Sequence, residues 1–273
     1  MRYQHPLTTT MNGSLLFFFF LIAAVVCTNV LTKPTFAQNI EKLQQEGTKK
    51  LVIQYQTDVI KRAEFRKFLV EKQMKSLSKL KTDGKILNYR ILFSWYAQPE
   101  VWDAMLELTF ESPTDLAHWK KLEETMPGGL SPEGLALGHP VLTSAADLAW
   151  EEGDNTTVKN DTSVYYVIPY SYNNAAEYID YAAAYVIPQY RGWLEEGLLK
   201  GYELLLNRHP VGKPWDALVI LRYSDIEAFG KRQHVLEKVR EGLRQKPKWV
   251  SYHARKGDIR SETENSIASL LSN

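Results

Sequence analysis

Two stretches of the chain share an alternation of apolar and other residues that is typical of a β-strand. They read WDAMLELTF and WDALVILRY, and they begin at Trp102 and Trp215, which are 113 positions apart. Because side chains on a strand point alternately to its two faces, every second residue lies on one face. That face is apolar from each tryptophan to Phe110 and Tyr223. We therefore expect both tryptophans to pack in the core beneath helices.

The same offset relates other residues, which indicates an internal repeat. Gly84 is matched by Gly197, and no insertion is needed from residue 51 to residue 130. Matches that keep one register over this length and coincide at glycines are typical of a duplicated unit. The sequence therefore predicts two copies of one fold.

The apolar pattern predicts six elements in each copy: strand, helix, strand, strand, helix and strand. In the first copy they span residues 50–57, 61–80, 86–96, 102–110, 113–126 and 145–152. In the second copy they span residues 163–170, 174–197, 199–209, 215–223, 225–243 and 248–256. Gly84 is placed to cap a helix, whereas Pro188 should kink or split one. A Pro/Gly-rich loop, residues 131–141, is extra in the first copy.

This order predicts an α+β fold in which each copy forms a four-stranded antiparallel sheet with two helices on one face. The other face of each sheet is then bare, and two copies in one chain can cover each other sheet to sheet. The chain thus resembles the dimeric α/β-barrel superfamily of ferredoxin-like proteins, in a tandem single-chain form. The resemblance rests on the paired strand-then-helix segments, WDAMLELTF…LAHWKKLEE and WDALVILRY…RQHVLEKVR. It implies a fold more than an activity, because the superfamily includes monooxygenases, haem enzymes, decarboxylases and proteins without known chemistry.

The predicted boundaries divide the chain into four parts. Residues 1–37 form a secretory signal peptide, 38–150 the first ferredoxin-like repeat, 151–163 a polar linker and 164–273 the second repeat.

The signal peptide is indicated by a short apolar run near the start of the chain. The run extends from Leu15 to Cys27, Arg2 precedes it, and the small-residue ending TFA closes at Ala37. A membrane span needs about 20 apolar residues, so the run is short for one. We expect export to the periplasm or the medium, with an uncleaved N-terminal anchor as the alternative.

Charge and cysteine content narrow the classes of partner. Removing Arg2 and Lys33 from the 33 basic residues leaves 31 against 32 acidic ones. This balance argues against a nucleic-acid partner and against a polybasic membrane-surface protein. Cys27, the single cysteine, leaves with the signal peptide, which excludes disulfides and thiol chemistry. An oligomer is possible but not required.

No motif names a reaction, so catalytic residues stay unknown. The chain lacks phosphate-binding, dinucleotide, zinc-protease and nucleophile-elbow signatures, and its histidines have no metal-site spacing. Asp115 with His118 and His234 with Glu237 fit solvated helix faces better than sites. His209, at a strand end, and His253, predicted on the last strand, are expected at the surface. The superfamily's haem enzymes would need a helical histidine, for which only His234 is comparable; we expect no cofactor, with haem left open.

The strand faces that point away from the helices carry polar residues where a purely structural contact would prefer apolar ones. Buried charges must be paired or hydrated. Two explanations stay open: ion pairs that close the sheets together, such as Arg90 with Glu203, or the lining of a ligand cavity. The candidate ligand-binding residues are Arg90, Glu107, Glu203, Asn207 and Arg222.

The function predicted from these features is an exported protein that binds or transforms a small, partly apolar molecule in a pocket between sheet and helices. The alternative from another class is a non-catalytic scaffold whose barrel is filled by side chains. A haem-dependent enzyme is a weaker alternative.

Export makes a direct prediction. N-terminal sequencing of the protein recovered from outside the cytoplasm should begin at Gln38, because cleavage follows the TFA ending. A chain that still begins at Met1 would instead indicate the anchored form.

Overall fold

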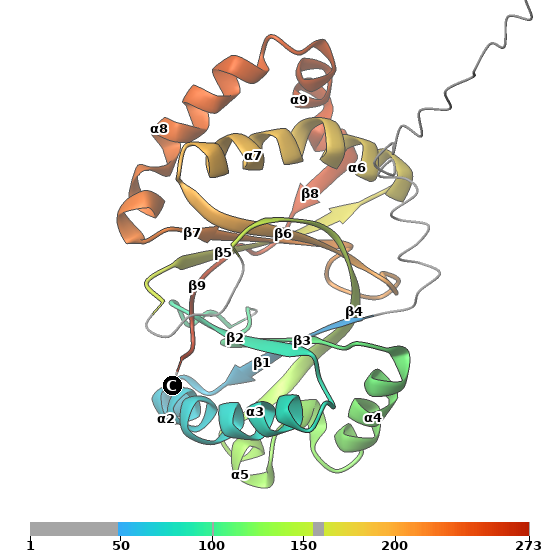
Figure 1. The fold of residues 1–273 in the computed structure, drawn as a ribbon, viewed down its shortest axis with the longest axis vertical. Helices are drawn as coiled ribbons and strands as arrows, with labels where there is room; N and C mark the ends of the chain where they lie inside the picture. Colours follow the sequence, from blue (N-terminus) through green and yellow to red (C-terminus); the bar gives the residue numbers. More distant parts are fainter. Residues whose placement is uncertain (1–48, 100, 155–160, 273) are drawn as a thin grey trace, which may run out of the picture. The chain divides into compact units, whose positions relative to one another are not determined.

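A computed structural model describes residues 49–99, 101–154 and 161–272, all within one compact unit, Thr35–Asn273. The unit is a mixed α+β structure with a large antiparallel sheet, which confirms the predicted α+β class (Figure 1). The predicted signal peptide lies outside the described residues. No helix in the described ranges is long and apolar enough to cross a membrane.

The first half of the unit runs from β1 to β4. Its elements are β1 (Lys50–Thr57), η1 (Val59–Lys61), α2 (Arg62–Phe68), η2 (Leu69–Gln73), α3 (Met74–Thr82), β2 (Asn88–Ser94), β3 (Ala104–Thr109), α4 (Pro113–Glu123), η3 (Pro127–Gly129), α5 (Pro132–Leu135) and β4 (Gly138–Gly153).

The second half runs from β5 to β9. Its elements are β5 (Val164–Tyr172), α6 (Ala175–Tyr181), η4 (Ala182–Val186), α7 (Ile187–Glu195), β6 (Leu199–Asn207), β7 (Ala217–Tyr223), α8 (Ile226–Leu243), α9 (Pro247–Ile259), β8 (Arg260–Glu262) and β9 (Ser266–Leu270).

The strand pairings close on themselves. Following neighbours from β1, the order is β1, β3, β2, β9, β5, β7, β6 and β4, and β4 pairs again with β1. All these pairings are antiparallel, and β8 adds to β5 outside the ring. A closed ring has no free sheet edge along its paired segments, which removes a site of unwanted pairing.

Three apolar cores follow from this arrangement. One lies between the first-half strands and α2, α3 and α4, and a second lies between the second-half strands and α6 to α9 (Figure 1). The third lies inside the ring, where strands of both halves contribute side chains such as Val52, Leu92, Val167 and Leu218. The interior of the ring is therefore packed core for much of its length.

Local sequence signals fix where several helices begin. Ser112 caps α4, and its hydroxyl accepts the backbone N–H of Asp115 in a capping box. Asn174 and Asp225 cap α6 and α8 in the same way, with side-chain oxygens that accept N–H groups of the first turn. Gly84 ends α3 with a φ of 68°, and Gly197 ends α7 with a φ of 70°, as the capping expectation requires.

The offset of 113 residues recurs in the long helical segments. A π-helical turn interrupts each at equivalent places, Leu69–Gln73 and Ala182–Val186. Pro188 was expected to kink or split its helix, but it lies in the first turn of α7, just after the π turn. The first half has the same interruption without a proline, so Pro188 does not cause it.

The gapless register is wrong for the first strand of each half. Lys50 of β1 pairs with Thr109 of β3, whereas Tyr165 of β5 pairs with Arg222 of β7. Arg222 is 113 positions after Thr109, but Tyr165 is 115 positions after Lys50. The first half therefore has two more residues between its first strand and its helices.

The placement of the two matched tryptophans beneath the helices is also wrong. Trp102 and Trp215 are buried, but they belong to the core inside the ring. The reason is that β3 begins at Ala104 and β7 at Ala217, so the two-residue period does not extend back to the tryptophans. Asp103 and Asp216, which follow them, accept backbone N–H groups at the strand ends.

The last predicted strand, residues 248–256, is instead part of α9. Trp249, Tyr252, Lys256 and Ile259 recur at intervals of three or four, a helical spacing, and Pro247 occupies the first turn. His253 therefore lies on a helix, and β9 is the strand that completes the second half. At the other boundary, β4 runs on to Gly153, so the predicted linker begins inside a strand.

Candidate functional site

Four charged side chains inside the ring, three of them buried and one half-buried, form a closed circuit of alternating sign. Arg90 contacts Glu107 at 2.7 Å and Glu203 at 2.6 Å. Lys50 contacts the same two carboxylates at 2.6 Å and 2.8 Å. Each cation thus bridges both anions, and we call Lys50, Arg90, Glu107 and Glu203 the charged quartet. The sequence-based pairing of Arg90 with Glu203 is confirmed.

Glu107 and Lys50 of the quartet stay ionised although burial disfavours the ionised forms. Burial alone would raise the pKa of Glu107, but Arg90 and Lys50 outweigh it and lower this pKa to about 2. Burial would lower the pKa of Lys50, but Glu107 and Glu203 raise it above its usual value. Each anion contacts both cations, and this attraction offsets the cost of removing each ion from water.

Arg222 belongs to a second polar cluster in the same interior. It contacts Asp161 at 3.1 Å and the hydroxyl of Ser163 at 3.1 Å, and it donates to the carbonyl oxygen of Asp154 at 2.9 Å. The Tyr165 phenol donates to Asp161 at 3.1 Å. The ring of Tyr165 lies 5.9 Å from the Arg90 guanidinium and 6.0 Å from that of Arg222, so it separates the two cations.

Asn207 shapes a turn. Its amide donates to the carbonyl oxygen of Trp215 at 3.0 Å, and its side-chain oxygen accepts the backbone N–H of His209 at 3.0 Å. Of the five residues predicted to line a ligand cavity, the structure therefore joins three in the quartet, places Arg222 beside Asp161 and gives Asn207 to a turn. Lys50 and Asp161 were not predicted, although Lys50 shares a strand face with Gln54 at the two-residue period.

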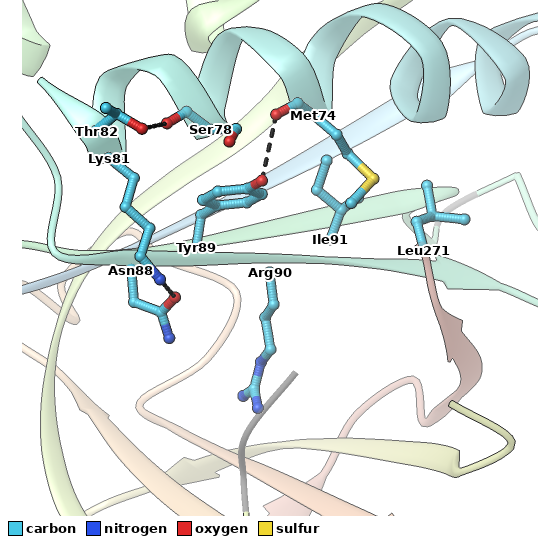
Figure 2. Close-up of a pocket in the computed structure, with 9 residues that line it drawn as sticks. All are labelled: Met74, Ser78, Lys81, Thr82, Asn88, Tyr89, Arg90, Ile91 and Leu271. Atoms are coloured by element: carbon cyan, nitrogen blue, oxygen red, sulfur yellow. Dashed lines mark hydrogen bonds between the residues drawn. The ribbon is translucent and has the colours of Figure 1, made fainter. Parts of the chain in front are cut away.

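Two open clefts border the quartet. One, of about 430 Å³, is lined by the quartet together with residues such as Asn88, Thr109 and Glu151. The other, of about 600 Å³, lies between α3 and β2 (Figure 2). In it Tyr89 and Ile91 point towards the helix, while Arg90 points to the opposite side of the strand. Tyr89 donates to the Met74 carbonyl oxygen at 3.2 Å, and Lys81 donates to Asn88 at 3.0 Å.

A third cavity, of about 260 Å³, lies between the second-half strands and α7, α8 and α9. We call it the tyrosine pocket. Its aromatic wall consists of Tyr166, Tyr170, Tyr181, Tyr185, Tyr190, Tyr223 and Trp193. Its charged lining consists of Arg232, Arg240, Lys256, Arg260 and Glu262. It occupies the place between sheet and helices that the sequence analysis predicted, but different residues line it.

The π turn and α7 position one wall of this pocket. Tyr185 and Val186 come from the π turn, and Gln189, Tyr190 and Trp193 follow on α7. Such turns shift side chains relative to a regular helix and are frequent at functional sites. Gln189 donates to the backbone oxygen of Tyr185 at 2.9 Å and accepts from Arg240 at 3.1 Å, so the α7 wall and α8 are cross-linked.

The tyrosine pocket is rich in hydrogen-bond donors. Burial raises the pKa of Tyr170, Tyr181, Tyr190 and Tyr223, that of Tyr181 to about 12, so these four phenols are neutral donors at pH 7. The indole N–H of Trp193 is buried without a hydrogen-bond partner. Arg260 contacts Glu262 at 2.9 Å, and this is the carboxylate of the lining. Cations and neutral donors thus outnumber anionic acceptors.

In the first half, the Pro/Gly-rich loop packs against the phenylalanines of α2. A Cβ at Gly134 would lie 2.6 Å from the Phe68 ring, and one at Gly138 would lie 2.8 Å from the Phe65 ring. Gly128 accepts from the Tyr55 phenol at 2.6 Å, and Gly129 accepts from the Gln73 amide at 3.1 Å. The loop therefore packs directly against the first-half helices, and the two halves differ here.

The pocket does not suit a haem held by histidine. No histidine lines it, and His234 is exposed on α8. His253 lies behind Tyr185, whose phenol is 2.9 Å from its Nδ1 atom. Within the described ranges no group of three His, Cys, Asp or Glu side chains could hold a metal ion.

Comparison with known proteins gives structural likeness only. No family model and no curated protein matches the chain. A mutant chlorite dismutase of Candidatus Nitrospira defluvii is 13% identical, with 85% of this chain and 94% of that chain covered and a TM-score of 0.49. An anthrone oxidase-like protein is 9% identical, with 83% and 92% covered and a TM-score of 0.48. A heme-binding protein of Thermus thermophilus is 11% identical, with 83% and 92% covered and a TM-score of 0.46. At these values none bears on ligand or reaction.

The quartet predicts strong coupling between Arg90 and Glu203. Arg90→Met should lower the free energy of unfolding by about 3–5 kcal/mol, because it leaves two carboxylates against Lys50 alone. Adding Glu203→Leu restores a balanced Lys50–Glu107 pair and should recover much of the loss. Urea unfolding of the single and double variants measures this.

The matched control is the exposed pair of Lys72 and Glu133, whose atoms lie 2.6 Å apart. Lys72→Met should cost about 1 kcal/mol or less. Additive losses in the Arg90 and Glu203 variants would contradict a closed circuit.

The quartet also predicts a loss of stability in acid. The pKa of Glu107 is about 2 in the folded chain, against an ordinary value of 4.5. Its contribution is therefore fully present above pH 4.5 and is lost as the pH falls towards 2, by about 3 kcal/mol in total. Unfolding free energies measured from pH 5 to pH 2 should fall less steeply in Glu107→Gln than in the wild type. Equal slopes would show that Glu107 is not held ionised.

Proposed function

We propose that this chain binds a small, partly apolar anion in the tyrosine pocket. The observation that carries the proposal is the unequal charge of the lining, four cationic side chains against the single carboxylate of Glu262, around an aromatic wall. Pockets that hold small molecules are typically apolar with a few convergent polar groups, and this one adds a surplus of positive charge. A carboxylate or a similar anion on an apolar body matches both parts.

The hydrogen-bonding character of the pocket points the same way. The phenols of Tyr181 and Tyr190 keep their protons at neutral pH because burial raises their pKa values. The unpartnered Trp193 N–H is a further donor that an acceptor on the ligand would satisfy. Lys256 makes no ion pair with any residue that the structure describes, so its charge is available to a ligand.

The lining supplies little that would act as a base or a nucleophile. Glu262 is engaged by Arg260, and the phenols are held neutral. We therefore propose binding and assign no reaction. The alternative function, a scaffold whose barrel is filled by side chains, concerns the inside of the ring, much of which is packed core. The tyrosine pocket lies outside the ring, so the two do not compete for the same space.

We further propose that the two halves are tandem copies of one ferredoxin-like unit and that the unit works after export. The common order of elements and the shared offset of the π turns and capping glycines support duplication. The apolar run and the TFA ending of the first 37 residues support export.

Three compounds with one phenylethyl body test the function: 3-phenylpropanoate, 2-phenylethanol and 2-phenylethylamine. Calorimetric titration should show the carboxylate binding about tenfold more tightly than the alcohol, because a hydrogen bond to a charged group contributes about 1.5–3 kcal/mol. Arg240→Met should remove most of that preference while leaving the alcohol's affinity unchanged.

Arg244→Met is the matched control, because Arg244 shares the partner Glu237 with Arg240 but does not line the pocket. It should behave like the wild type. Equal binding of alcohol and carboxylate to the wild type, or a preference that survives Arg240→Met, would contradict the proposal.

A further inference from the structure

The arginines of the tyrosine pocket lie at two ends, which α8 holds apart. Arg232, Leu236 and Arg240 all line the pocket and follow one another at intervals of four residues, so they share one face of α8. Eight residues of α-helix advance by about 12 Å, which separates the backbones of the two arginines along this wall. The side chain between them, Leu236, is apolar.

The first end is built around Arg232. Its guanidinium lies 4.1 Å from the centroid of the Phe229 ring and donates to the Phe229 carbonyl oxygen at 2.9 Å. The rings of Tyr223 and Tyr166 meet Phe229 edge-on, with centroids 5.0 Å and 5.9 Å away. Burial raises the pKa of Tyr223, and Arg232 opposes part of that rise, as a cation close to the phenol does. Among the residues described, Arg232 forms no ion pair, so its charge is available to a ligand.

The second end is built around Arg240 and Arg260. Arg240 donates to the side-chain oxygen of Gln189 at 3.1 Å, and the Gln189 amide donates to the backbone oxygen of Tyr185 at 2.9 Å. The ring of Tyr185 stacks on that of Tyr181, with centroids 5.1 Å apart. The Tyr181 phenol accepts from Arg260 at 3.2 Å. These contacts gather both cations around one group of side chains.

The sheet side of the pocket has the same two ends. Tyr166, Ile168 and Tyr170 line the pocket from one face of β5. Tyr166 belongs to the first end. The Arg260 guanidinium lies 4.8 Å from the centroid of the Tyr170 ring, at the second end. Four residues of strand advance by about 13 Å, so the strand and the α8 wall match in length. A cavity of about 260 Å³ that extends over this length is narrow and suits a rod-shaped body.

An apolar middle between two cationic ends determines the class of anion. Glu262 is the carboxylate of the lining, and it contacts Arg260 at the second end, so no lining residue neutralises Arg232. A ligand with one anionic group would leave one end unmatched. We propose that the tyrosine pocket takes an elongated dianion, with a carboxylate or a similar group at each end of a narrow apolar body. This inference rests on the proposed binding of anions in the pocket and names the class of anion.

Three carboxylates test the inference: benzene-1,4-diacetate, its 1,2-isomer and 4-methylphenylacetate. The two isomers have the same atoms and charge at different spacing, and 4-methylphenylacetate lacks the second carboxylate. Calorimetric titration of the whole chain should show the 1,4-dianion binding about fivefold more tightly than 4-methylphenylacetate, because one more partly exposed ion pair forms. The 1,2-isomer is too short to reach both ends and should bind less tightly than the 1,4-dianion.

Replacing Arg232 tests which end supplies the gain. Arg232→Met should remove the advantage of the 1,4-dianion and leave the affinity of 4-methylphenylacetate unchanged, because a single carboxylate is held at the second end. Arg232→Lys keeps the charge and should retain most of the advantage. Lys231→Met is the matched control, because Lys231 is a cation on the same turn of α8 that contacts Glu227 and does not line the pocket. It should behave like the wild type.

Equal binding of the two isomers would overturn the inference, and so would an advantage of the 1,4-dianion that survives Arg232→Met. Both results leave the binding of single anions intact. A wild type that binds 3-phenylpropanoate no better than 2-phenylethanol would instead overturn the proposed function, and this inference with it. Should Arg232→Met fail to fold, Arg232→Gln is also neutral and carries the same expectation.

Discussion

An antiparallel sheet that carries helices on one face has a second face that must also be removed from water. In this chain that constraint is met by closing eight strands into one ring, so that the inner faces of both halves bury each other. Closing the ring pairs the strand edges and also removes the inner apolar residues from water. Every polar residue on the inner face must then be satisfied inside the ring, and the charged quartet does this with equal numbers of cations and anions.

The regular elements could be predicted from the sequence because their patterns are local. Alternation placed β1 at residues 50–57 as observed, and the helix predicted at residues 225–243 matches α8, Ile226–Leu243. The Arg90–Glu203 pair followed from which face each residue occupies and from the cost of burying an unpaired charge. These inferences need only the two-residue period of a strand, the 113-residue offset and the free-energy cost of burying an unpaired charge.

Other features could not be predicted because they depend on how elements end or pack. The alternating apolar pattern extends back to Trp102, but β3 begins two residues later. The Trp102 side chain therefore lies in the core inside the ring and not in the core beneath the helices. The run at residues 248–256 was predicted as a strand. In the structure it is part of α9, from which Lys256 lines the tyrosine pocket. The tyrosine pocket required the π turn, which no local pattern indicated, and it brings together residues from β5, β7, α7, α8 and α9.

The two halves differ in what packs against their helices. In the first half, glycines allow a loop to pack directly against Phe65 and Phe68. In the second half, α9 lies over tyrosines and arginines and leaves a cavity.

Arg90 and Glu203 lie 113 positions apart in the chain, at matching places in their two halves, and they touch each other. In a dimer of two identical chains, side chains that meet at matching places are copies of one another, so a charge there would face its own sign. Here the covalent link between the halves allows one to carry the cation and the other the anion. Neither half can then pair as well with a second copy of itself as with its neighbour. The quartet thus favours the pairing of a first half with a second half over the pairing of two like halves.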